Sequence, residues 1–286
     1  MKIILSRTMG YCNGVSRALS LAEAALEKAK ATDRPVYSLG KLIHNTATCA
    51  YFSEQGMEVI SEAEGHDPGL VVLRAHGVPD LVRQNLLDAG FDLVDATCPV
   101  VKYNLSRIAS YGETHQVLIV GYQGHPETLA MQGVLCPDGN VCKTTLITNV
   151  EDIGTPEPGS AYVVFVQTTF DQGHWQKIYK MLKSWESKGC TMVFANQVCP
   201  SSINRRRAVV ELVDTCDAVV VIGGKESANT KALYQLVREK GKMAWHIEDE
   251  TEITAEMRSY DILGVTAGAS TPAVVIQRVI ETLQQE

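Results

Sequence analysis

The chain alternates short apolar runs with longer segments in which apolar residues recur every three or four positions. The short runs are rich in Val and Ile, and most contain no polar position. Such runs are typical of strands buried on both faces of a parallel sheet. The strands predicted in this way cover residues 2–5, 35–38, 70–74, 93–95, 116–120, 162–166, 191–194, 218–222, 243–246 and 262–265.

Helical spacing is plainest in the segment that follows Val15. Its apolar positions form one stripe along a helix, and residues 231–240 and 272–283 show the same spacing. Strands that alternate with helices in this way predict an α/β fold.

Three times, a predicted strand or loop leads into a cysteine that a helix follows. We therefore predict three similar α/β modules, residues 1–96, 97–195 and 196–286, that face a common centre. The last predicted helix belongs to the third range. The three motifs are Gly10-Tyr11-Cys12-Asn13-Gly14, Asp95-Ala96-Thr97-Cys98-Pro99 and Asn196-Gln197-Val198-Cys199-Pro200.

Composition narrows the class of protein. The 286 residues are 45% apolar and 21% charged, as in ordinary folded proteins, and the net charge is -7. Without a basic arm, a nucleic-acid partner is not expected. The chain start is too short in apolar residues for a signal peptide, and no apolar run approaches the ~20 residues of a membrane span. We expect a cytoplasmic protein whose eight cysteines form no structural disulfides.

Three cysteines share a setting that favours metal binding. Cys98 and Cys199 each precede a proline, which is favoured at the first position of a helix, and Cys12 also opens a helix. A helix N-terminus stabilises a thiolate, which is the ligand that iron–sulfur clusters need. A single cysteine is more often a buried apolar residue, but three in matched settings favour ligands. Three thiolates leave one iron of a cubane open, and an open metal position is typical of catalysis.

The remaining cysteines lack this setting. There is no Cys-x-x-Cys pair, which argues against a zinc ribbon, a thioredoxin-type motif and a ferredoxin-type run. Cys136 and Cys142, which flank Pro137-Asp138-Gly139, are the only others that we would test for metal. The others are interpreted as structural or incidental: Cys49, Cys190 and Cys216.

Loops rich in His, Ser, Thr, Asn and Gly follow several predicted strands. In open α/β sheets, ligands bind at the carboxyl ends of the strands. His44, His76 and His125, with nearby hydroxyls and amides, indicate a diphosphate site, whereas an isolated loop histidine is more often a solvated or capping residue. Glu127 follows Pro126 in one such loop, and a carboxyl group in a partly dry pocket can keep its proton near neutral pH.

A set of short motifs then identifies a family resemblance. In chain order they are Gly-Tyr-Cys-Asn-Gly-Val, Ile-His-Asn, Ala-His-Gly-Val, Asp-Ala-Thr-Cys-Pro, Gly-His-Pro-Glu, Gln-Thr-Thr, Gly-Gly-Lys-x-Ser-x-Asn and Thr-Ala-Gly-Ala-Ser. They resemble the LytB/IspH family of 4-hydroxy-3-methylbut-2-enyl diphosphate reductases. The resemblance runs from Cys12 to about residue 283.

The resemblance implies a trefoil-like arrangement of three α/β modules around a central 4Fe–4S cluster with three cysteine ligands and one open iron. It implies reductive dehydroxylation of an allylic diphosphate to isopentenyl and dimethylallyl diphosphate, in the non-mevalonate route to isoprenoid precursors. It also implies ferredoxin or flavodoxin as the electron donor.

Residue roles follow from the same resemblance. Cys12, Cys98 and Cys199 would bind the cluster, Glu127 would deliver protons with His125 beside it, and Thr168 would position the substrate hydroxyl. The residues implied to hold the diphosphate are His44, His76, His125, Ser227, Asn229 and Ser270.

The third module departs from the family pattern in two places. Ser202 keeps a hydroxyl where threonine is expected, but Arg206 replaces a glutamine. Glu226 replaces an asparagine, and its carboxylate would oppose diphosphate binding unless it points away or is paired with Lys225 or with an arginine. Ala228 can still offer its backbone N–H to phosphate.

Three alternatives remain. One is a paralogous reductase with a different hydroxylated substrate. The second is a non-catalytic iron–sulfur sensor, which would not need Glu127, Thr168 and the full set of hydroxyls and histidines. The third is a structural zinc protein, which the dispersed cysteines disfavour.

Overall fold

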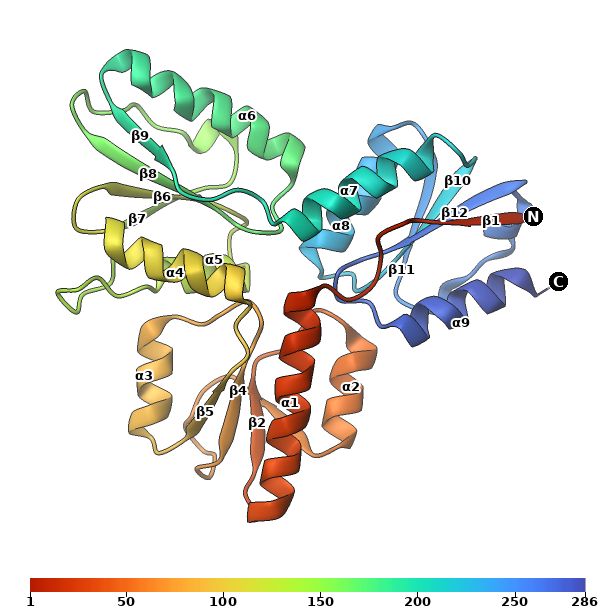
Figure 1. Ribbon diagram of the computed structural model, residues 1–286, viewed down its shortest axis with the longest axis horizontal. Coiled ribbons are helices and arrows are strands. Elements are labelled where there is room, and N and C mark those ends of the chain that lie inside the picture. Colours follow the sequence, from red (N-terminus) through yellow and green to blue (C-terminus); the bar gives the residue numbers. More distant parts are fainter. Residues whose placement is uncertain (286) are drawn as a thin grey trace. The chain divides into compact units, whose positions relative to one another are not determined.

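The structure is a computed structural model that describes residues 1–285. Within these residues, twelve strands form three sheets, each with four strands that pair in parallel. Helices join the strands, as Figure 1 shows. The predicted α/β class and the presence of three similar modules of sheet and helices are therefore confirmed, whereas the boundaries of the modules stay a prediction. In the described part of the chain, no helix has both the length and the apolar character that a membrane crossing requires.

The chain divides into two compact units. Unit 1 contains Met1–Ser16, Ile43–Glu54 and the described residues from Pro200 onward, and unit 2 contains Arg17–Leu42 and Gln55–Cys199.

Unit 2 holds two of the sheets. Their strand orders are β3-β2-β4-β5 and β7-β6-β8-β9. The first sheet consists of β2 (Val36–Leu39), β3 (Met57–Ile60), β4 (Leu70–Leu73) and β5 (Asp92–Asp95). The second consists of β6 (Gln116–Val120), β7 (Thr144–Ile147), β8 (Ala161–Val166) and β9 (Thr191–Phe194). The helices of this unit are α3 (Asp80–Asp88), α4 (Pro99–Tyr111), α5 (Pro126–Gln132) and α6 (Gln172–Lys183), with the short 3-10 helices η1 (Val150–Asp152) and η2 (Ser184–Lys188).

Unit 1 holds the third sheet, in the order β1-β12-β10-β11. Its strands are β1 (Lys2–Leu5), β10 (Ala218–Ile222), β11 (Met243–Ile247) and β12 (Ile262–Ala267). Its helices are α2 (Thr46–Glu54), α7 (Pro200–Val213), α8 (Ala228–Glu239) and α9 (Ala273–Gln284), with η3 (Glu250–Glu252) and η4 (Ala255–Ser259). Helix α1 (Asn13–Thr32) begins in unit 1 and continues into unit 2.

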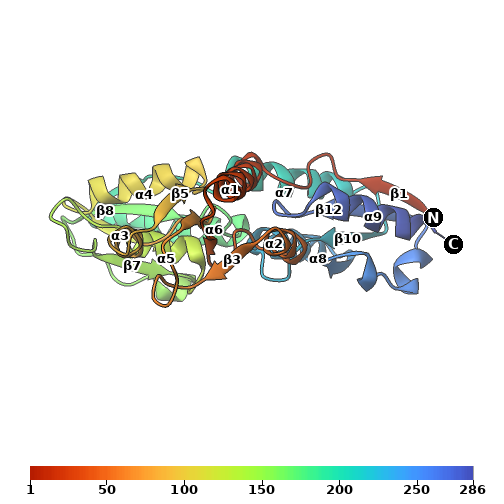
Figure 2. The ribbon, with the colours of Figure 1, turned by 90° about the horizontal axis from the view of Figure 1, so that it is seen from below.

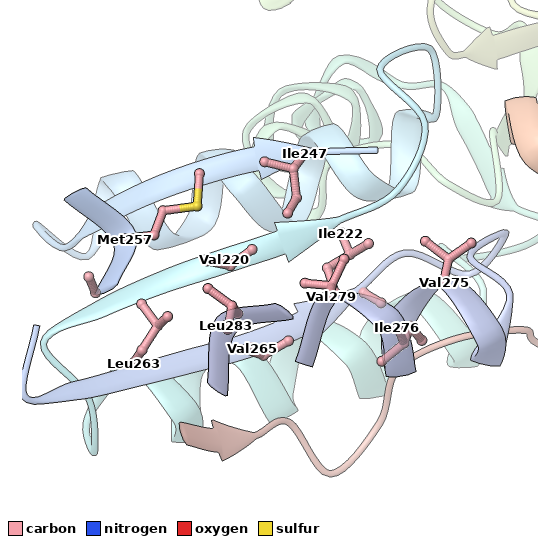
Figure 3. Close-up of a cluster of buried hydrophobic side chains, with 12 residues drawn as sticks. Val220, Ile222, Ile247, Met257, Leu263, Val265, Val275, Ile276, Val279 and Leu283 are labelled. Carbon is pink, nitrogen blue, oxygen red and sulfur yellow. The ribbon is translucent and has the colours of Figure 1, made fainter. Parts of the chain in front are cut away.

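The sheet of unit 1 has a core on each face. On one face, Val279 and Leu283 of α9 pack with Val265 and neighbouring strand residues, as Figure 3 shows. On the other face, residues of α7 and α8 pack against the alternate positions of β10, such as Val219. Because both faces are covered, β10 is buried at every position, which explains its continuous apolar run.

Most of the predicted elements are present. The ten predicted strands are confirmed, with small shifts at their ends, and so are the three predicted helices. Two strands, β3 and β7, were not predicted. One strand pairs outside its predicted module. β1 lies in the first predicted module, residues 1–96, but it pairs with β12 of the third sheet. The start of β1 and the end of α9 lie close together in both Figure 1 and Figure 2.

One expectation about the cysteines is wrong. Cys136 and Cys142 form a disulfide, although no structural disulfide was expected. The pair closes a small hairpin, so the local geometry of the chain brings the two cysteines together. The expectation had considered only the redox state of the compartment.

Candidate active site

The three sheets repeat one arrangement of chemical groups at the carboxyl ends of their strands. In each sheet, the two central strands lead into polar loops, and one edge strand leads to a cysteine at the start of a helix. Strand β5 leads to Cys98, β9 leads to Cys199, and β1 leads to Cys12. Polar groups therefore gather where parallel sheets usually bind ligands.

The backbone fixes the three cysteines in the same way. In every case the cysteine N–H donates a hydrogen bond to a carbonyl in the loop that follows the neighbouring strand. The pairs are Cys12 with Ala269 at 3.1 Å, Cys98 with Ala75 at 2.9 Å, and Cys199 with Thr168 at 2.9 Å. The three cysteines, which share a sequence setting before a helix, therefore also share a backbone hydrogen bond.

Each of these cysteines stands at a helix N-terminus and is half-buried. Cys98 is the N-cap residue of α4, and Pro99 occupies the first helical position. The N–H of Val15 points at Cys12 Sγ, 3.4 Å away. Because helix N-termini carry partial positive charge and unsatisfied N–H groups, they favour thiolates. The donor set therefore fits an iron–sulfur cluster, and it is too dispersed in sequence for a zinc finger.

The loop before Cys98 is held by Asp95. Its carboxylate accepts hydrogen bonds from Lys102 at 2.8 Å and from the Thr97 N–H at 3.1 Å, and Arg83 lies 3.3 Å away. Burial alone would raise the pKa of Asp95, but these hydrogen bonds and the Arg83 charge outweigh it and hold that pKa well below the usual range. Arg17 also donates to the Thr97 carbonyl at 3.1 Å. The loop that presents the cysteine is therefore tied on both sides.

Glu127 and Thr168 form a closed pair in unit 2. Glu127 lies in the first turn of α5 and is only 1% exposed. One carboxylate oxygen accepts from the Thr168 N–H at 2.8 Å, and the other accepts from the Thr168 hydroxyl at 2.8 Å. The Thr168 carbonyl in turn accepts from the Cys199 N–H. Thr168 thus connects the carboxyl group to the backbone of a candidate ligand.

Burial changes the chemistry of this carboxyl group. Burial raises the pKa of Glu127 to about 7, and the two hydrogen bonds from Thr168 oppose that rise. A carboxyl group with such a pKa can both hold and release a proton near neutral pH, as a general acid requires.

His125 and His76 lie beside this pair. His125 caps α5, and its Nδ1 accepts the Glu127 N–H at 3.1 Å. The neutral ring therefore carries its proton on Nε2. The rings of His76 and His125 meet edge to face, with centroids 5.5 Å apart. Unit 2 thus brings together two of the three predicted diphosphate histidines.

Unit 1 places Ser227, Ala228 and Asn229 at the N-terminus of α8. Ser227 caps the helix by accepting the Thr230 N–H at 3.3 Å, and Ala228 and Asn229 open its first turn. Both Ser227 and Asn229 are buried, and the Asn229 Nδ2 group has no hydrogen-bond partner among the described residues. A buried donor at a helix N-terminus is suited to an anionic ligand such as phosphate.

The loop that carries His44 packs directly against the loop after β10. A Cβ at Gly224 would lie only 2.5 Å from the His44 carbonyl oxygen, so only glycine allows this approach. The Ser270 hydroxyl donates to the same carbonyl at 3.1 Å. Unit 1 therefore brings His44, Ser270 and the start of α8 into one region.

Three residues near these sites were not assigned roles from the sequence. Gln167 is fully buried, and its side-chain oxygen accepts from the Tyr122 N–H at 3.0 Å, which joins the loops after β6 and β8. Arg205 is buried and donates to the Gly10 carbonyl. Glu248 accepts from the Lys225 N–H at 2.6 Å and from a hydroxyl of α2. No sequence pattern indicated these three residues, because the contacts described here are made largely to backbone groups, which a sequence does not show.

The two departures lie in unit 1. Ser202 is half-buried in the first turn of α7. Glu226 is exposed, and the side chain of the neighbouring Lys225 pairs with Glu252 at 2.9 Å.

Comparisons with known proteins agree with this arrangement. The family model described as LytB protein matches residues 3–284. The chain is 34% identical to the 4-hydroxy-3-methylbut-2-enyl diphosphate reductase of Caldanaerobacter subterraneus subsp. tengcongensis, over 99% of this chain and 97% of that protein. It is also 34% identical to the enzyme of the same name from Treponema denticola, over 99% of both.

Two solved structures are similar over 99% of the chain. One is the E-1-hydroxy-2-methyl-but-2-enyl-4-diphosphate reductase of Plasmodium falciparum, with a TM-score of 0.89, 23% identity and 88% of that chain covered. At this identity, the similarity concerns the fold alone. The other is an (E)-4-hydroxy-3-methyl-but-2-enyl diphosphate reductase described as the terminal enzyme of the non-mevalonate pathway, with a TM-score of 0.70, 31% identity and 99% of that chain covered.

Proposed function

Because this chain belongs to the LytB family, we propose that it is a 4-hydroxy-3-methylbut-2-enyl diphosphate reductase. The reaction replaces an allylic hydroxyl with hydrogen, consumes two electrons and two protons, and releases water. Its products are isopentenyl and dimethylallyl diphosphate. The observation that carries the proposal is the buried Glu127–Thr168 pair, because it supplies a protonated carboxyl group near neutral pH.

Cys12, Cys98 and Cys199 are the residues that would hold a 4Fe–4S cluster. Their shared backbone hydrogen bond and their helix N-termini support this assignment. A cluster with three thiolate ligands would supply the electrons and one open, Lewis-acidic iron.

Glu127 is the residue that delivers protons. With a pKa of about 7, about half of these carboxyl groups keep their proton at neutral pH. Thr168 holds both carboxylate oxygens, so that the proton is presented in a fixed direction, and its hydroxyl also positions the hydroxyl of the substrate. Because the pair is buried, bulk water does not compete for the proton.

The proposed diphosphate contacts begin with the donors of helix α8. In unit 1, the Asn229 amide, the Ser227 hydroxyl and the Ala228 N–H offer donors at the start of α8. Ser270 fixes the His44 backbone through its hydrogen bond to the carbonyl. The remaining contacts in the proposal come from the side chains of His44, His76 and His125 and from Ser202.

Glu226 does not count against this substrate. Its side chain is exposed, and the loop that carries it is fixed by Lys225 contacts to Glu248 and Glu252.

The reductase would take its electrons from ferredoxin or flavodoxin, and it would work in the cytoplasm.

Anaerobic purification followed by an assay tests the proposal. The protein should contain about four irons per chain, and it should convert the diphosphate substrate to both products with a reduced donor. A protein that carries the cluster but leaves this substrate unchanged would refute the proposed reaction.

Glu127→Gln tests the proton role separately. Because general acids typically contribute about 10²–10⁴-fold to a rate, we expect kcat to fall by at least about 100-fold while the iron content stays unchanged. Glu113→Gln, which changes an exposed glutamate of the same unit, is the matched control and should retain activity. Full activity in Glu127→Gln would contradict the assignment.

A further inference from the structure

The disulfide between Cys136 and Cys142 has no part in the proposed reaction. It lies in the hairpin that joins α5 to β7, where Leu135 and Val141 form an antiparallel bridge. The hairpin is already closed by backbone hydrogen bonds. The Cys136 N–H donates to the Asn140 carbonyl at 2.8 Å, and the Cys142 N–H donates to the Val134 carbonyl at 2.9 Å. The two sulfurs are therefore held near each other by the backbone as well as by their bond.

The hairpin is anchored within unit 2. The Leu135 N–H donates to the Asp80 carboxylate at 2.8 Å, and the Asp80 N–H donates to the Gly133 carbonyl at 3.0 Å. These contacts tie the hairpin to the first turn of α3. Breaking the disulfide would leave these anchors in place.

A glycine makes room for the disulfide. Gly112 follows the last residue of α4 and has an ordinary helical backbone conformation, with φ of -59°, so its backbone does not require glycine. A Cβ at this position would lie 2.3 Å from Cys136 Sγ and 2.8 Å from Cys142 Sγ. The sulfur pair therefore occupies the space that a side chain at residue 112 would fill.

The two cysteines differ in exposure. Cys142 is 4% exposed and belongs to the core that Ile108 and Met131 also form. Cys136 is half-buried, and the turn residues 137–141 that follow it are exposed. Cys136 is therefore the more exposed residue of the pair.

We propose that Cys136 and Cys142 form a reversible thiol–disulfide exchange site for low-molecular-weight thiols, with Cys136 as the sulfur that is attacked. This inference does not depend on the proposed reductase activity. It follows from the preformed hairpin, the space at Gly112 and the unequal exposure of the two cysteine residues. In proteins of reducing compartments, disulfides are usually transient or redox-sensing rather than structural.

The exchange balances in two steps. A thiolate RS⁻ attacks Cys136 Sγ, the S–S bond breaks, and Cys142 leaves as a thiolate that takes up a proton. A second RS⁻ attacks the mixed disulfide, forms RS–SR and releases Cys136. Two thiols are thus oxidised to one disulfide while the protein disulfide gains their two electrons. In the reverse direction, oxidised RS–SR restores the Cys136–Cys142 bond.

Redox titration of the anaerobically purified holoenzyme tests the proposal. The protein is equilibrated with reduced and oxidised glutathione at several ratios and quenched with acid. Differential alkylation and peptide mass spectrometry then report each cysteine separately. Cys136 and Cys142 should change together from thiols to disulfide as the ratio changes. The buried Cys190 and Cys216 should remain thiols throughout and serve as internal controls.

Single variants identify the attacked sulfur. Cys142→Ser should accumulate glutathione on Cys136, and Cys136→Ser should accumulate at least about tenfold less on Cys142, because access limits exchange. The wild-type titration decides the main point even where a variant fails to fold. A pair that stays reduced at every ratio, a pair that stays oxidised at every ratio, or glutathione bound chiefly to Cys142 would each overturn the proposal.

Discussion

The hydroxyl of Thr168 should set the pH range in which Glu127 holds its proton. Thr168→Val keeps the shape of the side chain and the backbone N–H, but it removes the hydrogen bond from the hydroxyl to Glu127, which is 2.8 Å long. That bond stabilises the charged carboxylate, so its loss favours the protonated form. A hydrogen bond to a charged group contributes about 1.5–3 kcal/mol, and about 1.4 kcal/mol corresponds to a change of 1 in pKa. The pKa of Glu127, now about 7, should therefore rise by roughly 1 to 2.

The assay is the dependence of kcat on pH with a saturating reduced donor. A general acid must be protonated, so the rate falls as pH rises through its pKa. The alkaline limb of the profile should move to higher pH in Thr168→Val by roughly 1 to 2 pH units. Thr168→Ser keeps a hydroxyl at the same place, and its limb should stay near that of the wild type. A limb that does not move in Thr168→Val, or that moves to lower pH, would refute this account of how Glu127 holds its proton.

Three further predictions concern stability and substrate binding. Burial raises the pKa of Glu127 from 4.5 to about 7, so the free energy of unfolding should fall by about 3 kcal/mol as pH rises between these values. Urea unfolding at pH 5 and pH 8 should show this loss in the wild type and not in Glu127→Gln. Glu248→Gln weakens the contact to the Lys225 N–H, so KM for the diphosphate should rise about tenfold with little change in kcat, and an unchanged KM would exclude this positioning role. Gly112→Ala places a Cβ against the disulfide and should destabilise by about 1–3 kcal/mol, whereas Gly154→Ala, which has open space, should leave the Tm unchanged.

The strands that the sequence did not predict show what a hydrophobic pattern can detect. β3 and β7 are both edge strands, and their sequences, Met-Glu-Val-Ile and Thr-Thr-Leu-Ile, contain polar residues. An edge strand is covered on fewer sides, so it can keep polar side chains in contact with water. A search for continuous apolar runs therefore finds buried strands such as β10 and overlooks these two.

Contacts that depend on the backbone also cannot be predicted from a sequence pattern. The motif around Glu127 indicates a proton donor, but its pairing with Thr168 depends on the parallel pairing of β6 and β8, which brings the two following loops together. The disulfide is a contrasting case. Its hairpin turn was visible in Pro137-Asp138-Gly139, but the expected reducing compartment argued against a bond that local geometry allows.

Cys12 shows most clearly what the structure adds to the sequence. Cys98 and Cys199 follow edge strands of sheets whose other strands lie nearby in the chain, so their equivalence is visible locally. Cys12 follows β1, which completes its sheet by pairing with β12, more than two hundred residues away in the sequence. That pairing sets the Cys12 N–H against the Ala269 carbonyl, in the loop after β12. The first cysteine thereby acquires the same backbone contact as the other two. A helix start alone would favour a thiolate at any of many positions, whereas the three cysteines combine a helix start with this backbone contact. The combination is the stronger reason to propose them as one ligand set.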